Sequence, residues 1–313
     1  MKILIAEYAV ATGLPGTYAV EGRAMLSVLA RSFERLGHDV IYPTAGPAIG
    51  AGQGVVLEGK SDRDFEEFLA GSGADAGLVI APDELLPGFL EILEKSTVNL
   101  GCSPAAARLC ADKLACTRRL EEAGIPVVEI ADPDDPGDDP FVLKPRFGCG
   151  SERMELVDKL PEDLADRIAT KFHEGESLSV SLVASGDRVL PLTVNKQLVS
   201  VEAGFEYEGG IVPYHSDREE EILKAAKMAA LALDLSGYAG IDLVVGDLPR
   251  VVDMNPRPTT SIVGIAKVMR EELADLILRA RVSTLPERVR VEGSCEFRKE
   301  YIELWDRPLE DKL

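Results

Sequence analysis

Apolar runs of strand length alternate with a segment of helical periodicity in the N-terminal third of the chain. Residues 2–6 and 39–42 predict strands, and residues 21–36 between them predict a helix. Further apolar runs at 76–81 and 98–101 predict two more strands. This β-α-β opening favours an α/β layer fold for the N-terminal part of the chain.

Helix-start signals mark the next part. Ser103 followed by Pro104 is an N-cap with proline at the first helical position, and Asp112 begins a second helix that runs to Gly124. Residues 141–144 predict a strand that leads into a glycine-rich segment. We therefore expect a boundary between two structural units near Ser103.

Strand and helix signals alternate through the C-terminal half. Residues 178–183 and 189–194 predict an antiparallel pair, and residues 217–234 predict a long helix. The charged segment from about residue 283 predicts a peripheral tail. Residues 45–54 are small and glycine-rich, and because they lack the phosphate-loop and dinucleotide-binding motifs they predict a mobile loop.

Two short β-rich runs flank a turn at residues 246–249 and predict a hairpin. Counting outward from a four-residue loop pairs Val245 with Arg250 and places Asp242 directly opposite Asp253. Carboxylates opposed across a strand pair lie about 5 Å apart, which costs stability unless something compensates. Replacing Asp253 by Ala is therefore expected to stabilise the ligand-free fold.

Asn255 falls on the same face of this hairpin as Asp253, because side chains alternate along a strand. A hard divalent cation, which prefers carboxylate and amide oxygens, is the simplest way to compensate the paired carboxylates. An acidic edge hairpin without a metal is the alternative interpretation.

Composition and charge narrow the class of protein. The chain has 313 residues, of which 46% are hydrophobic and 28% charged, and this is ordinary for a globular protein with two or three subdomains. The net charge of −20 argues against binding to nucleic acid or to anionic membranes, and a phosphate-bearing ligand needs local cations. With no membrane-length apolar run and no signal-peptide pattern, we expect a cytoplasmic protein.

Four segments, in chain order, resemble the motifs of ATP-grasp ligases. They are Asp112-Lys113 before a helix ending in Gly-Ile-Pro126, Val142-Leu-Lys-Pro145 before Gly148-Cys-Gly-Ser151, Phe172-His-Glu-Gly-Glu176, and Asp242 with Asp253-Met-Asn-Pro-Arg257. The resemblance implies an α/β and α+β protein, with an N-terminal α/β pre-ATP-grasp domain (1–102) followed by a two-lobed ATP-grasp fold. The small lobe is expected over residues 103–169, and the large lobe, with the metal site and a C-terminal tail, over residues 170–313.

The same resemblance implies an ATP site. Two lysines would contact the phosphates and the adenine edge, a glycine loop would close over the β- and γ-phosphates, a hinge would contact adenine through its backbone, and an acid would bind the ribose. The two lysines are Lys113 and Lys144. The glycine loop contains Arg146, Gly148, Gly150 and Ser151, and the hinge contains Thr170, Lys171, Phe172 and His173. The acid that would bind the ribose is Glu176, with Ser177 as an alternative register. Thr170 and Lys171 replace the Gln-Glu that family members often carry.

Metal and catalytic roles are implied for the late segment. Asp242, Asp253 and Asn255 would bind one or two Mg²⁺ (or Mn²⁺) ions, and Arg257 would stabilise the transferring phosphoryl group. Lys196 is a further catalytic candidate facing the site, and a plain strand-end lysine is the equal alternative.

Within the family, residues 6–8, 21–26 and 255–260 resemble the tyramine–glutamate ligases of archaeal methanofuran biosynthesis. This resemblance implies small-molecule substrates, with the glutamate γ-carboxylate joined to the amine of tyramine through an acyl phosphate. Glu21 would pair with a substrate ammonium, unless it is only a first-turn acid favoured by the helix dipole. A ligase for another acid and amine, and a nucleotide-binding regulatory protein without turnover, remain alternatives. The sequence leaves the oligomeric state open, a homodimer included.

Overall fold

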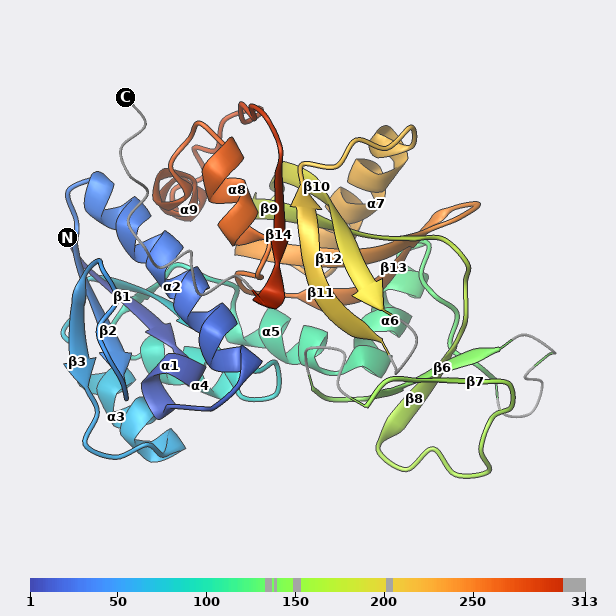
Figure 1. Cartoon of the computed structure of the whole chain (residues 1–313), viewed down its shortest axis with the longest axis horizontal. Coiled ribbons are helices and arrows are strands. Elements are labelled where there is room, and N and C mark those ends of the chain that lie inside the picture. The colour runs from blue at the N-terminus through green and yellow to red at the C-terminus, as the bar shows by residue number, and fades with distance from the viewer. Residues whose placement is uncertain (133–136, 138–139, 149–152, 201–204, 301–313) are drawn as a thin grey trace.

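The computed structural model describes residues 1–132, 137, 140–148, 153–200 and 205–300, which form three sheets and the helices that cover them (Figure 1). One sheet is parallel and two are antiparallel. The predicted combination of an N-terminal α/β unit with a following α+β region is confirmed. The division of the chain at residues 102 and 169 stays a prediction.

The N-terminal sheet has the strand order β3-β2-β1-β4-β5 and is parallel throughout. The predicted strands and the long helix are present, and β3 begins inside the segment predicted as a mobile loop. No helix was predicted at the positions of α1, α3 and α4. The elements are β1 (Lys2–Glu7), α1 (Tyr8–Thr12), α2 (Thr17–Arg35), β2 (Asp39–Thr44), β3 (Gln53–Val56), α3 (Asp62–Gly71), β4 (Ala76–Ile80), α4 (Leu86–Leu93) and β5 (Val98–Asn99).

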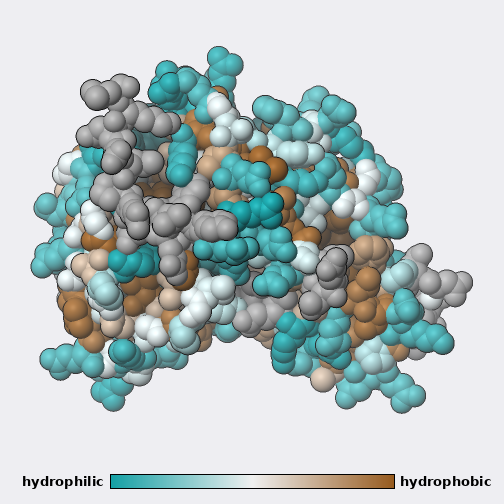
Figure 2. Space-filling model, in the orientation of Figure 1, coloured by the Kyte–Doolittle hydropathy of each residue, from teal (hydrophilic) through white to brown (hydrophobic). Residues whose placement is uncertain are grey.

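Two capped helices lead from this unit into the small antiparallel sheet β7-β6-β8. The side chains of Ser103 and Asp112 accept hydrogen bonds from Ala106 N and Ala115 N, as the N-cap interpretation predicted. The elements are α5 (Pro104–Ala111), α6 (Lys113–Glu122), β6 (Phe141–Pro145), β7 (Glu155–Val157) and β8 (Arg167–Lys171). Figure 2 shows apolar residues gathered over this small sheet, whereas hydrophilic residues cover most of the remaining face.

The large antiparallel sheet has the order β13-β12-β9-β10-β11-β14. Helix α7 packs on one of its faces, and α8 and α9 pack on the other. The elements are β9 (Glu176–Ser185), β10 (Arg188–Ser200), β11 (Glu206–Val212), α7 (Glu219–Ala232), β12 (Gly237–Val245), β13 (Pro249–Asn255), α8 (Ile262–Val268), α9 (Leu273–Arg281) and β14 (Cys295–Arg298). Among the described residues, no helix is both long and apolar enough to span a membrane.

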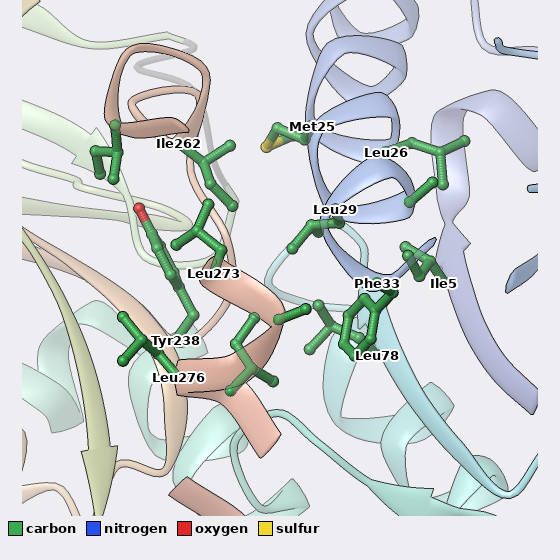
Figure 3. Packing of buried hydrophobic residues seen from close by; sticks show 14 of the residues in the cluster. Ile5, Met25, Leu26, Leu29, Phe33, Leu78, Tyr238, Ile262, Leu273 and Leu276 are labelled. Carbon is green, nitrogen blue, oxygen red and sulfur yellow. The ribbon is translucent and has the colours of Figure 1, made fainter. Parts of the chain in front are cut away.

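One hydrophobic cluster joins the N-terminal unit to the large sheet. Figure 3 shows Met25 and Leu29 of α2 pointing toward Ile262 and Leu273 of the C-terminal helices, with Tyr238 of β12 beyond them. The other face of α2 packs on the parallel sheet through the same cluster. Because protein interiors are close-packed, this shared core holds the two parts in one relative position.

The C-terminal segment is not the peripheral tail that its charge predicted, as far as residue 300. Strand β14 pairs with β11, and Phe297 is 2% exposed within the main hydrophobic cluster. The outward positions Glu296 and Arg298 dominate the composition, so one inward aromatic residue is too weak a signal to predict a strand. At the crossing, a Cβ on Gly209 would lie 2.1 Å from the carbonyl oxygen of Phe297, so this contact requires glycine.

Replacing Phe297 by Ala tests whether β14 is part of the core. The cavity and the lost burial are expected to lower the free energy of unfolding by about 3–5 kcal/mol. Leu231→Ala, at an α7 position that is 46% exposed, is the matched control and should change it by less than about 1 kcal/mol. Chemical denaturation of both variants measures these changes in the free energy of unfolding. Equally small changes in both would show that β14 is not part of the core.

Glu7 ends β1 inside the protein and caps α1. Its carboxylate accepts a hydrogen bond of 2.6 Å from the backbone N–H of Val10. A Cβ on Gly22 of α2 would lie 2.4 Å from the same carboxylate, so the helix leaves room for it only because position 22 is glycine. Burial raises the pKa of Glu7 to about 7, against the lowering effect of its backbone hydrogen bonds and of the charge on Arg257.

The raised pKa predicts a pH-dependent stability. The folded state binds a proton at Glu7 up to about pH 7, whereas the unfolded state releases it near 4.5, so this contribution is lost as pH rises between those values. Glu7→Gln keeps an acceptor for Val10. The free energy of unfolding of this variant should therefore rise by roughly 3 kcal/mol relative to that of the unmodified chain as the pH increases from 4.5 to 8. Thermal unfolding across that range measures the difference, with Glu122→Gln at the exposed end of α6 as the control. A constant difference would show that Glu7 is ionised throughout.

Candidate active site

A cavity of about 630 Å³ opens where the three sheets meet. Its walls come from the ends of β1 and β4, from α2, from β6 and β8 of the small sheet, and from strands β9 to β13 of the large sheet. This volume lies in the range of small-molecule sites. Most of the site residues predicted from the sequence line this cavity.

The acidic hairpin forms, with a different register at its turn. Val245 pairs with Pro249 rather than Arg250, so the predicted pairing beside the loop is wrong by one residue. The register then shifts between Asp242 and Leu243, which leaves Val252 as an extra residue on β13. Because of this bulge, Asp242 faces Asp253 as predicted.

Side chains of the protein compensate the two facing carboxylates. The Nζ atom of Lys113 lies 2.8 Å from Asp253 Oδ2, at the start of α6. Asp242 accepts hydrogen bonds from Gln197 Nε2 at 2.9 Å and from Asn255 Nδ2 at 3.0 Å. A lysine and two amides thus compensate the pair, where the prediction was a metal ion, with an acidic hairpin lacking a metal as the alternative.

The two carboxylates differ in pKa. Burial, and next the charge of Asp253, raises the pKa of Asp242 to about 7. Burial also acts to raise the pKa of Asp253, but the charges of Lys113 and Lys144 outweigh it and hold that pKa below its ordinary value. Asp253 therefore carries the negative charge more readily than Asp242.

Lys144 is 2% exposed on β6 and reaches across to the hairpin. Its Nζ atom donates a 2.8 Å hydrogen bond to the carbonyl oxygen of Val252, the bulged residue. Burial lowers the pKa of Lys144 to about 8, although the charge of Asp253 opposes this. The bulge therefore serves two purposes, because it restores the facing of Asp242 and Asp253 and presents a carbonyl to the lysine.

Arg257, just after β13, is oriented by the N-terminal unit. Its Nε atom lies 3.1 Å from Oδ1 of Asp83, a buried carboxylate that follows β4. Burial raises the pKa of Asp83, while Arg257 and then Lys113 act to lower it. Asp83 was not predicted as a site residue, because nothing in Ala-Pro-Asp-Glu84 distinguishes it from a surface turn.

The expected phosphate loop and hinge line the cavity in part. Gly148 and the hinge residues Thr170, Lys171, Phe172 and His173 are at its wall. Two hinge N–H groups are already used, because Lys171 N donates to Glu129 O at 2.9 Å and Phe172 N donates to Pro140 O at 2.8 Å. Gly150 and Ser151 lie outside the described residues.

Arg146 does not line the cavity. Its guanidinium makes a bidentate pair with Asp112, the cap of α6, at 2.8 and 2.6 Å. This pair ties the start of the glycine loop to the helix that carries Lys113. The phosphate contact implied for Arg146 therefore has no support from this geometry.

Glu176 and Lys196 lie away from the cavity, and they pair with each other. Tyr214 OH also donates to Glu176 Oε1 at 2.8 Å. Because side chains alternate along strands, their neighbours Ser177 and Gln197 face the cavity instead. The expectation that Lys196 faces the site is not met, and the alternative register at Ser177 is the one that reaches the wall.

The donor set at the hairpin suits a hard divalent cation. The carboxylates of Asp242 and Asp253 and the side chain of Asn255 lie together there, and Lys113 pairs with one of the carboxylate oxygens that a cation would take. Among the described residues no group of three or more acidic, histidine or cysteine side chains is close enough to enclose a metal. A cation at this place therefore needs further oxygen ligands, which nucleotide phosphates supply in sites of this kind.

Glu21 of α2 also lines the cavity, on the side of the N-terminal unit. Its Oε1 atom lies 3.1 Å from the Nζ atom of Lys299, which follows β14 and lines the same cavity. Lys299 had no signal in the sequence, since it belonged to the segment predicted as a tail.

Comparison with known proteins agrees with this geometry. Residues 110–261 match the ATP-grasp domain. The tyramine–L-glutamate ligase of Methanocaldococcus fervens is 30% identical over 289 residues, which cover 88% of this chain and 93% of that protein. The D-alanine–D-alanine ligase of Desulforudis audaxviator is 26% identical over 237 residues, which cover 63% and 76%.

A solved structure shares the whole arrangement. An ATP-grasp superfamily protein from Archaeoglobus fulgidus superposes with a TM-score of 0.75 at 29% identity, covering 93% of this chain and 90% of that one. The match includes the N-terminal unit as well as both antiparallel sheets, because it covers nearly the full length. The chain therefore belongs to the ATP-grasp superfamily, among its carboxylate–amine ligases.

Proposed function

We propose that the protein joins the γ-carboxylate of glutamate to the amine of tyramine and converts ATP to ADP and phosphate. The observation that carries this proposal is one cavity holding two buried lysines, a facing carboxylate pair and an oriented arginine, namely Lys113, Lys144, Asp242, Asp253 and Arg257. The relative from Methanocaldococcus fervens, which spans nearly the same length, supports the choice of substrates.

The chemistry needs activation of the carboxylate. A carboxylate oxygen is a poor leaving group, so the γ-phosphoryl group of ATP is first transferred to it, which forms an acyl phosphate and releases ADP. The amine nitrogen then attacks the acyl carbon, the carbon–oxygen bond to phosphate breaks, and the nitrogen loses a proton. Catalysis of such transfers is mainly positioning and charge stabilisation.

The chain's own residues suit these two tasks. Lys113 and Lys144 place positive charge against the phosphates in a site where the net charge of −20 would otherwise repel them. Arg257, held by Asp83, presents a planar fork for the oxygens of the transferring group. Asp242, Asp253 and Asn255 would hold the one or two Mg²⁺ (or Mn²⁺) ions, which supply charge neutralisation between the phosphate oxygens.

A ligase for a different amino acid and acceptor is the second candidate. The observation in its favour is the similarity to the D-alanine–D-alanine ligase, a relative that matches much of this chain and is named for different substrates. A regulatory protein that binds ATP without turnover is the third, and it predicts nucleotide binding with no product.

Release of ADP tests the proposal. With Mg²⁺, ATP and glutamate, we expect ADP release that depends on tyramine, with γ-glutamyltyramine identified by mass spectrometry. The control omits each substrate in turn. ADP release only with another acid and amine would discard this substrate pair, and ATP binding without release across a broad panel would favour the regulatory protein.

The site geometry predicts opposite effects on stability for its two carboxylates. Asp253→Asn leaves the buried Lys113 beside a neutral partner, so it should lower the free energy of unfolding by about 3–5 kcal/mol. Asp242→Asn removes the repelled carboxylate and keeps a polar group, so it should raise the melting temperature at pH 8. The sequence alone had assigned the stabilising effect to Asp253.

Both variants should lose ADP release, since each removes a carboxylate of the metal-binding pair. Thermal unfolding and the ADP assay on the same preparations separate the two effects. Normal ADP release by either variant would contradict the metal assignment, and a stabilising Asp253→Asn would contradict the charge distribution given above.

A further inference from the structure

An ion pair between Glu21 and Lys299 lies in the cavity wall, apart from the residues proposed to bind the nucleotide. Glu21 comes from α2 and Lys299 from the residue after β14, whose end lies beside that helix (Figure 1). Their side chains are 16% and 23% exposed, and both line the cavity. Both also lie outside residues 110–261, the part that matches the ATP-grasp domain.

The pair is close but incompletely satisfied. The Nζ atom of Lys299 is 3.1 Å from Glu21 Oε1, yet this buried oxygen accepts no hydrogen bond from the described residues. A buried carboxylate oxygen without a donor is costly, because it has lost water and gained no hydrogen bond in return. A ligand with an N–H group at this position would remove that cost.

The ion pair and the acidic hairpin line the same cavity. Tyr207 of β11 lines the cavity, and its pKa is raised by burial and next by the charges of Glu21 and Asp242. The phenol therefore lies within the electrostatic reach of both carboxylates. A small molecule bound in this cavity can therefore contact the ion pair as well as the reacting groups.

A purely structural role explains the pair poorly. Strand β14 is already fastened by its pairing with β11, from Val212↔Cys295 to Gly209↔Arg298, and by the buried Phe297. Partly buried ion pairs contribute little net stability, because desolvation offsets the attraction. Nothing in this fastening requires the two charges to face the cavity.

We infer that Glu21 and Lys299 bind the α-ammonium and the α-carboxylate of an amino-acid substrate. The carboxylate of Glu21 is an acceptor and the ammonium of Lys299 a donor, so together they complement the two charges of an amino acid. This inference rests on the proposed function and deepens it. Because the α-carboxylate is held at the ion pair, the side-chain carboxylate is the one that faces Arg257 and the acidic hairpin.

Substrate analogues that lack one of the two charged α-groups of glutamate test the two contacts separately. Glutarate lacks the α-ammonium and 4-aminobutyrate lacks the α-carboxylate, while both keep a carboxylate at the far end. Glu21→Gln should lower kcat/KM for glutamate about 10- to 100-fold and leave glutarate nearly unchanged. Lys299→Met should do the same for glutamate and leave 4-aminobutyrate nearly unchanged. The KM values for ATP and tyramine should stay within about twofold.

Arg298→Met is the matched control. It removes a neighbouring cation whose ion pair with Glu208 is on the surface, so it should leave all three substrates unaffected. An equal loss for every substrate in Glu21→Gln or Lys299→Met, together with a lowered melting temperature, would show that the pair is only structural and would overturn the inference.

Calorimetric measurement of amino-acid binding tests the inference independently of the proposed function. The absence of turnover with glutamate and tyramine would refute the proposed substrates alone. Binding of a panel of α-amino acids to the full chain in the presence of ATP and Mg²⁺ then tests the ion pair directly. Binding that weakens in both variants supports the inference, whereas binding that survives in both, or no binding of any α-amino acid to the unmodified chain, overturns it.

Discussion

The ion pair between Lys113 and Asp253 is the interaction on which the site depends. It connects the first residue of α6 to the acidic hairpin of the large sheet, and it decides which of two facing carboxylates is ionised. Lys144 reaches the same hairpin from the small sheet. Two cations thus hold an arrangement of carboxylates that would otherwise repel, and the same cations suit the phosphates of a nucleotide.

The N-terminal unit contributes to the site through position rather than through motifs. Helix α2 is packed between the parallel sheet and the C-terminal helices, so Glu21 is held at the cavity by a core on both sides. Asp83 comes from a loop of the same unit and orients Arg257. A site assembled from three sheets in this way keeps its groups in fixed geometry, which acyl-phosphate chemistry requires.

Local signals predicted local features well. The caps at Ser103 and Asp112, four of the five strands of the parallel sheet and the facing of Asp242 and Asp253 follow from spacing over a few residues, whereas β3 begins in a segment predicted as a loop. The prediction at the turn was wrong by one residue, because a bulge at Val252 has no sequence signature of its own. Strand β14 was missed, because a short strand with one inward aromatic residue resembles a charged tail.

The sequence by itself determined the family, the order of the nucleotide-binding segments and the acidic pair, because these depend on residue type and short-range spacing. Only the tertiary structure decided which face each strand residue presents, so that Ser177 and Gln197 reach the cavity and Glu176 and Lys196 do not. It alone also brought Lys299 to Glu21 across almost the whole chain. Such contacts arise from packing between distant elements, and no local pattern encodes them.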